Sequence, residues 1–481
     1  LQLSRKSGSR SLEAAAPEER NSAMPAAASA SGASIRRSRR NEFCCCGPGR
    51  KRYLIALLCS LGLTVVIGMR AEMVAIMDYL NKRSASNSSS AAVVAAASAA
   101  SASAATSSTV HPAGEPVVGK PGGSGSNGMF QPSTHRPMPW QNMANDLIEN
   151  SLFIGYLVAS PIGGYLTVHH DSSLLLGCSV ALTCGLNLFL PLVTQIAADI
   201  SASIAIIVLL RLLQGLAEGC LVPAVFGTLR FWGPETERSS LLCSAVIGVS
   251  LGPLIGLPVC QEIENAWGWA VVFYIYANIG LIWCIFWWRL IDEKPPKDQR
   301  LGKRERQYLE TAVKKKVLYA DRRIRVPWKE IFKSRPVYAI FFTYAADDWT
   351  FQISSVCMQS YYHQMYNTDI ARTIFLLSFP FLARSLFVPI GGFLADFIKL
   401  KTSLNWTAIR KLFAGLGFGL KAFFFVALGF ANDAVVATIL LSLALGFSGL
   451  AVAGYAVNVM ELAPNFCGLV MGFANSISTF T

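Results

Sequence analysis

Runs of about twenty apolar residues, separated by short polar links, constrain this chain more than any other feature of its sequence. A run of that length is enough for a helix to cross the hydrocarbon core of a membrane. Hydrophobic residues make up 53% of the 481 residues and charged residues only 15%, against roughly a quarter charged in ordinary soluble domains. This composition excludes a disordered protein and argues against a soluble enzyme. We predict an all-α integral membrane protein of the transporter or channel type.

The net charge of +13 is concentrated in two segments of the chain. Residues 1–52 hold 11 Lys and Arg against 4 Asp and Glu, and residues 289–335 hold 16 against 7. Both segments flank apolar runs, where basic residues mark the cytoplasmic side of a membrane. We therefore expect no nucleic-acid partner, a disordered cytoplasmic tail over 1–52, and a basic cytoplasmic linker over 291–336.

The order of the apolar runs predicts two halves, an N-terminal six-helix half over 53–290 and a C-terminal half over 337–481. The segment 81–146 is rich in Ser and Ala and carries a sequon at Asn87, which predicts a glycosylated extracytoplasmic loop. A twelfth span is expected to be missing from this sequence. The eleven predicted spans lie at about 53–80, 147–167, 174–194, 202–226, 241–260, 270–290, 337–360, 373–392, 408–430, 434–457 and from 466 onward.

One hexapeptide occurs twice, in corresponding apolar runs. Residues 161–166 read Pro-Ile-Gly-Gly-Tyr-Leu in the second run, and residues 389–394 read Pro-Ile-Gly-Gly-Phe-Leu in the eighth. Six runs separate the two copies, which is the spacing that two homologous six-helix halves would give. The repeat therefore supports the division into two halves.

A longer motif includes the second copy. Residues 391–399 read Gly-Gly-Phe-Leu-Ala-Asp-Phe-Ile-Lys and resemble the Gly-x-x-x-Asp-x-x-Lys signature of the major facilitator superfamily. The glycines permit close helix packing. Asp396, at a helix end, is expected to interact with the positive N-terminus of a neighbouring helix, in a structural or gating role. The first-half copy departs from the signature, because Val-His-His-Asp stands at 168–171.

Within that superfamily, the membrane portion resembles the family of vesicular glutamate transporters, sialin and sodium-phosphate cotransporters. The resemblance implies a major-facilitator fold of two six-helix halves that give alternating access to a central site. The stretches that carry it are 68–70, 155–165, 211–219, 267–274, 335–340, 349–351 and 446–449.

Two arginines fall inside the predicted spans of the first half. A guanidinium in hydrocarbon is costly and normally faces a cavity or a partner, and its planar fork suits a carboxylate or a phosphate. Arg70 and Arg211 therefore suggest an anionic substrate. Glu218 lies two helical turns after Arg211 on the same face, so a structural ion pair is the alternative. The resemblance implies substrate contacts for both arginines and proton coupling for Glu218.

At three positions the residue differs from the one that the resemblance to glutamate-transporting relatives leads us to expect. Glu149 stands where a histidine is expected, and we add it to Glu218 as a proton-coupling candidate. Asp347 stands in place of an arginine, and Arg384 in place of an apolar residue. Arg384 and Asp347 could form an ion pair, Arg384 could replace the lost cationic contact to substrate, or Asp347 could be hydrated near a helix end. These departures weaken the case for glutamate specifically.

Three further residues are candidates because of their positions. Lys421 lies in the middle of the ninth span, where it needs a partner, so we expect a structural ion pair. The resemblance places Asn458 near the substrate site. Trp349 is expected either to line the cavity or to pack against neighbouring helices.

Together these residues predict a secondary active transporter of organic anions in a lipid bilayer, with L-glutamate as the leading substrate. Proton-coupled transport of sialic acid, sodium-coupled transport of phosphate, and a transport-inactive receptor-like relative are the alternatives. We expect no enzymatic activity, no cofactor and no metal. The expected coupling ion is H⁺, with Na⁺ or Cl⁻ as alternatives. The expected location is an intracellular vesicle membrane, synaptic or lysosome-like, with the plasma membrane as the alternative.

Overall fold

The computed structural model describes residues 51–73, 139–196, 200–292, 294–295, 301–313 and 325–481. Within these ranges every regular element is a helix. The predicted tail before residue 51 lies outside the described residues. So do residues 74–138, which include most of the predicted loop and its sequon at Asn87.

The first half of the described chain is built from long helices, two of which are broken into consecutive segments. A short 3₁₀ turn, η1 (Arg70–Glu72), ends the first helix. The breaks at Gly219-Cys220 and Ile247 leave the paired segments continuous enough to count as single spans. The elements are α2 (Lys51–Met69), α4 (Pro139–His169), α5 (Ser172–Ile196), α6 (Ile200–Glu218), α7 (Leu221–Trp232), α8 (Arg238–Val246), α9 (Gly248–Trp267) and α10 (Trp269–Leu290).

The second half begins with a helix that changes its winding. A π-helical turn, η3 (Ile353–Cys357), joins two α-helical segments, and such turns commonly occur at functional sites. Long helices follow. The elements are α14 (Arg335–Gln352), α15 (Met358–Tyr366), α16 (Ile370–Lys401), α17 (Trp406–Leu428), α18 (Ala434–Leu462) and α19 (Cys467–Phe480).

Nine of the helical segments among the described residues are long and apolar enough to cross a membrane. The helix α19 is a shorter apolar helix. The predicted span at 337–360 corresponds to α14, η3 and α15, a segment that carries two adjacent aspartates, Asp347 and Asp348. The all-helical prediction is therefore confirmed for the described part of the chain.

Several predicted boundaries were wrong, because helices continue beyond their apolar runs. The first helix begins at Lys51, so the last two residues of the predicted disordered tail are helical. Arg52 is 4% exposed, and its Nε lies 2.9 Å from a carboxylate oxygen of Glu237. The helix α4 begins at Pro139, inside the predicted loop, which suits proline's preference for the first helical turn. The predicted linker contains the helices α11 (Lys303–Ala312) and α13 (Trp328–Lys333).

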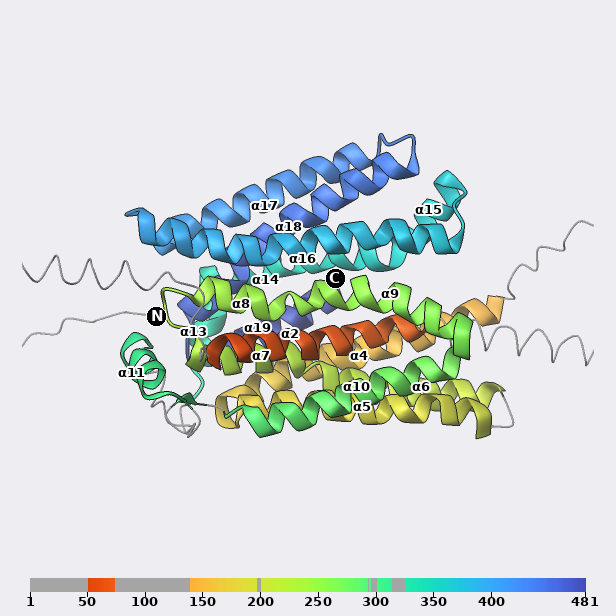
Figure 1. Cartoon of the computed structure of the whole chain (residues 1–481), viewed down its shortest axis with the longest axis horizontal. Coiled ribbons are helices and arrows are strands. Elements are labelled where there is room, and N and C mark those ends of the chain that lie inside the picture. The colour runs from red at the N-terminus through yellow and green to blue at the C-terminus, as the bar shows by residue number, and fades with distance from the viewer. Residues whose placement is uncertain (1–50, 74–138, 197–199, 293, 296–300, 314–324) are drawn as a thin grey trace, which may run out of the picture.

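The long helices run side by side in one bundle (Figure 1). The helices α16, α17 and α18 lie on one flank, α4, α5, α6 and α10 on the other, and α9 between them. Each copy of the repeated Gly-Gly pair packs against the opposite half. A Cβ on Gly164 would lie 2.8 Å from the carbonyl oxygen of Gly468 in α19, and one on Gly392 would lie 2.7 Å from that of Ser239 in α8. Only glycine permits these close approaches.

Candidate functional site

A cavity of about 210 Å³ lies between the two halves. The start of α2 contacts α11 through a hydrogen bond from the Lys51 backbone to Glu305, so the linker marks one end of the bundle. The cavity reaches Met73, at the other end of that first span. It therefore lies toward the end of the bundle away from the linker. Its polar lining consists of Arg70, Glu149, Arg211, Gln352, Ser355 and Gln359.

Arg70 and Glu218 form an ion pair at the edge of this cavity. The Arg70 Nε and Nη2 atoms both donate to Oε2 of Glu218, at 3.1 and 2.9 Å. The guanidinium also lies 5.7 Å from the ring centroid of Phe153 and 5.5 Å from that of Tyr156. Glu218 is 2% exposed, whereas the Arg70 side chain keeps 27% of its surface accessible. Arg70 thus holds the carboxylate while still facing the cavity.

Arg211 is held differently, by an amide. Its Nη1 donates to Oε1 of Gln214 at 3.1 Å, and Arg211 is 3% exposed. Among the described residues no carboxylate lies within ion-pair distance of Arg211. The sequence alternative of an Arg211–Glu218 pair is therefore wrong, because Arg70 takes that partner. A buried guanidinium that lines a cavity is left here with an amide as its hydrogen-bond partner, and its charge and planar fork suit an anion.

The amide at Gln214 continues into a chain of hydrogen bonds. Gln214 Nε2 donates to Oδ1 of Asn187 at 3.2 Å, and Asn187 Nδ2 donates to Oε2 of Glu72 at 2.8 Å. Sequence reasoning missed Glu72 and Asn187. The available signal was a charged residue two positions after Arg70 and an amide within an apolar run, both of which need partners in a membrane.

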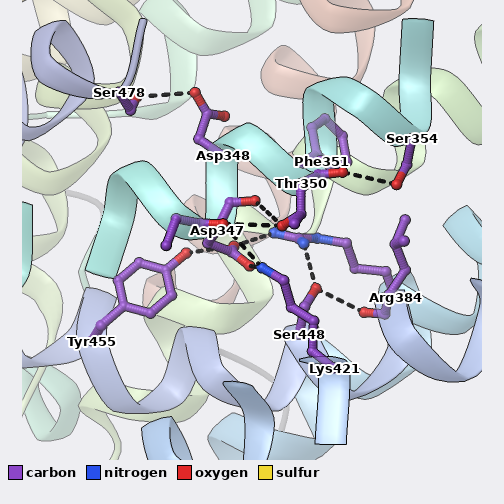
Figure 2. Close-up of polar contacts among 12 residues, drawn as sticks. Asp347, Asp348, Thr350, Phe351, Ser354, Arg384, Lys421, Ser448, Tyr455 and Ser478 are labelled. Atoms are coloured by element: carbon purple, nitrogen blue, oxygen red, sulfur yellow. Dashed lines mark hydrogen bonds and ion pairs between the residues drawn. The ribbon is translucent and has the colours of Figure 1, made fainter. Parts of the chain in front are cut away.

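A second polar cluster lies in the C-terminal half, where three side chains converge on Asp347 (Figure 2). Arg384 Nη2 lies 2.8 Å from Oδ2 of Asp347, and Lys421 Nζ lies 3.0 Å from Oδ1. The Tyr455 hydroxyl donates to Oδ2 at 2.8 Å. Asp347 is 2% exposed, so the alternative of a hydrated aspartate is wrong. The structure brings Asp347 together with Arg384, as the pairing alternative expected, and Lys421 finds the same partner.

The cluster sits directly beside the larger cavity. Phe351 lines both the 210 Å³ cavity and a second cavity of about 60 Å³ that Asp347 and Arg384 line. The Arg384 guanidinium lies 4.9 Å from the Phe351 ring centroid, and its Nη1 donates to the Ser448 hydroxyl. Asp348 points the other way and accepts a hydrogen bond of 2.9 Å from Ser478 (Figure 2). Phe351 therefore lies between the two cavities, with Arg384 on the side of the smaller one.

Two predicted site residues lie elsewhere. Trp349 is 54% exposed and is not among the residues that line the three cavities described here, which fits a position facing lipid. Asn458 lines a separate cavity of about 320 Å³, together with Arg238 and Glu461. That cavity also includes Val313, just after α11, so it lies at the linker end of the bundle. Sequence position could not separate the two ends of a long helix such as α18.

Asp396 links the two halves at the linker end. Its Oδ1 accepts a hydrogen bond from the Ser239 backbone at 3.3 Å, and its Oδ2 accepts from the Ser240 backbone and hydroxyl at 2.8 and 2.7 Å. These donors form the first turn of α8, so the carboxylate lies at a helix N-terminus, as expected from the motif. In the described part of the chain no group of three His, Cys, Asp or Glu side chains is placed to hold a metal ion.

Comparison with known proteins gives consistent matches. Residues 146–481 match the family model described as Major Facilitator Superfamily. Over 441 residues the chain is 29% identical to vesicular glutamate transporter 2 of Bos taurus, which covers 91% of this chain and 68% of the relative. It is 30% identical over 442 residues to vesicular glutamate transporter 2.2 of Danio rerio, with the same coverage.

Solved structures of similar fold have much lower sequence identity. The human organic anion transporter MFSD10 matches with a TM-score of 0.57 at 13% identity, over 90% of this chain and 91% of its own. The proton:xylose symporter XylE matches with a TM-score of 0.60 at 11% identity, over 89% of this chain and 86% of its own. These likenesses concern the arrangement of the helices.

Proposed function

The chain belongs to the Major Facilitator Superfamily, and from that premise we propose that it is a secondary active transporter of organic anions. It is an integral membrane protein in contact with lipid, and its family implies a small-molecule substrate. The observation that carries the proposal is Arg211, a buried guanidinium that lines the cavity between the halves and contacts an amide. An anion entering the cavity would supply the missing negative charge.

The leading substrate is L-glutamate, which the similarity to vesicular glutamate transporters supports. One feature of the site favours a second candidate. Asp347 already supplies a carboxylate to both Arg384 and Lys421, so the cations of the C-terminal half are occupied from within the protein. A substrate with a single anionic group, such as sialic acid, needs only the arginines of the N-terminal half.

Glu218 is the proposed proton-coupling residue. It is buried and paired with Arg70, which faces the cavity. An anion that competes for Arg70 would free the carboxylate and change its affinity for a proton. Glu149 is exposed on the cavity wall and is the second proton-coupling candidate. The proposed transport needs no cofactor, with H⁺ as the coupling ion and Na⁺ or Cl⁻ as alternatives, and a vesicle membrane is the proposed location.

Labelled uptake into proteoliposomes tests the proposal. L-glutamate, N-acetylneuraminate and phosphate are each supplied under an imposed potential and, separately, under a pH gradient. Saturable uptake of one of them is expected, with loss in Arg211→Gln and retention in Arg372→Gln, a matched change at an exposed arginine of α16. Folded wild-type protein that takes up none of the three anions under either gradient would contradict the proposal and favour a receptor-like relative.

The role of Glu218 has its own test in the same vesicles. The Glu218→Gln variant should retain exchange of labelled for unlabelled substrate, because exchange needs no net proton movement. It should lose accumulation driven by a pH gradient. If pH-dependent uptake is unchanged in this variant, Glu218 does not couple protons.

A further inference from the structure

Glu72 is a buried acidic residue that the proposed mechanism does not use. It is 0% exposed and lies in the η1 turn, two residues after Arg70. Its Oε2 accepts the hydrogen bond from Asn187, while its Oε1 has no hydrogen-bond partner among the described residues. An ionised carboxylate is costly to bury unless its oxygens are paired or hydrogen-bonded, and the neutral acid is much cheaper.

The groups around Glu72 supply little compensating charge. Among the described residues, the cation that acts on it from a neighbouring helix is Arg211 of α6. The other described titratable groups that face it are Cys184 of α5, Cys260 of α9 and Tyr276 of α10, none of which contributes a positive charge. Arg70, on its own element, is committed to Glu218 through two hydrogen bonds. The ionised form of Glu72 therefore depends mainly on Arg211.

The chain of hydrogen bonds between Arg211 and Glu72 has one direction. Arg211 donates to Gln214, Gln214 donates to Asn187, and Asn187 donates to Glu72. Each amide accepts a hydrogen bond on the Arg211 side and donates one on the Glu72 side. The aligned amide dipoles therefore carry the electrostatic stabilisation by the guanidinium to the ionised carboxylate. All three relay positions are buried, at 3, 1 and 0% exposed for Arg211, Gln214 and Asn187.

We propose that Glu72 is a second proton-binding residue, whose protonation is linked to anion binding at Arg211 through Gln214 and Asn187. An anion at Arg211 cancels the positive charge that stabilises ionised Glu72. A proton then passes from a hydronium ion of the solvent to Oε1, which forms an O–H bond on Glu72 and leaves a water molecule, and it returns to solvent water when the anion departs. This linkage rests on the proposed function for the identity of the anion. Its consequence is that the anion and the proton move together.

Infrared spectroscopy of the purified protein in lipid tests whether Glu72 binds a proton. Wild type should show a carboxylic-acid carbonyl band that titrates with pH and is lost in Glu72→Gln. The matched control is Glu262→Gln, a change at an exposed glutamate of α9, in which the band should remain. A band of undiminished amplitude in Glu72→Gln, or no difference between the wild-type and Glu72→Gln spectra, would overturn the proposal. This arm needs no ligand, so it is independent of whether anion transport is found.

The linkage is tested by adding L-glutamate or N-acetylneuraminate at saturating concentration, with chloride exchanged for a non-binding anion. Addition should shift the titration midpoint of the Glu72 band to higher pH, because the bound anion favours the protonated acid. Gln214→Met fills the same space without hydrogen bonds, so it should keep the band and lose the shift. An equal shift in folded Gln214→Met would exclude the relay. No shift in wild type that demonstrably transports the added anion would exclude the linkage itself.

Discussion

At the scale of single residues, the Asp347 cluster joins one carboxylate to two cations, and this imbalance decides how it responds to mutation. Asp347→Asn leaves Arg384 and Lys421 buried without a counter-charge, which should cost about 3–5 kcal/mol. Lys421→Met leaves the Asp347–Arg384 pair intact and should cost much less. The double variant should recover part of the loss from Asp347→Asn, because one uncompensated cation is gone.

Thermal unfolding in detergent, followed by size-exclusion chromatography, measures these differences as a double-mutant cycle. Two additive losses would show that Lys421 and Asp347 act independently, against the 3.0 Å contact between them. A loss in Lys421→Met as large as that in Asp347→Asn would also contradict the expected order.

At the scale of helices, the contact between α4 and α6 depends on the absence of side chains. A Cβ on Gly215 of α6 would collide with the backbone carbonyl of Leu152 in α4. Gly215→Ala should therefore destabilise the protein by about 1–3 kcal/mol, as overpacking does. Gly185→Ala in α5 is the matched control, since nothing lies within 4 Å of its added Cβ. Equal melting temperatures for the two variants would show that α4 and α6 can move apart without loss of stability.

The helices themselves could be predicted from the apolar runs, whereas the contacts between their polar side chains could not. The expectation that Asp396 lies at a helix N-terminus came from a local motif, and the structure supplies the helix, α8. Which cation Asp347 contacts is set by residues 37 and 74 positions away, a separation that no local pattern encodes. Glu72 was missed for the same reason, because the hydrogen bond that it accepts from Asn187 spans 115 residues along the chain. The π-helical turn at 353–357 also has no distinctive residue pattern.

At the scale of the whole molecule, the two cavities beside Phe351 differ in access. The larger cavity lies toward the end of the bundle away from the linker, and Ser355 lines it, whereas Val388 lines the smaller cavity and is 2% exposed. A membrane-impermeant thiol reagent applied from the non-cytoplasmic side should therefore modify Ser355→Cys faster than Val388→Cys. Rates measured above the wild-type background test this, and equally fast modification of the two positions would show that Phe351 does not separate the smaller cavity from that side of the membrane.

Two contacts between the halves at the linker end are made by groups of opposite charge, one by a carboxylate and the other by a guanidinium. On one flank Asp396 of α16 accepts hydrogen bonds from the start of α8. On the other, Arg230 of α7 donates to the carbonyl oxygens of Asn465 and Thr167, at 2.6 and 3.1 Å, and so joins the start of α19 to α4. A negative charge introduced nearby, such as a phosphate, would repel the Asp396 carboxylate and would compete with the two carbonyl oxygens for the Arg230 guanidinium. Separation of the two halves at this end thus requires both contacts to break, and one added anion would weaken both.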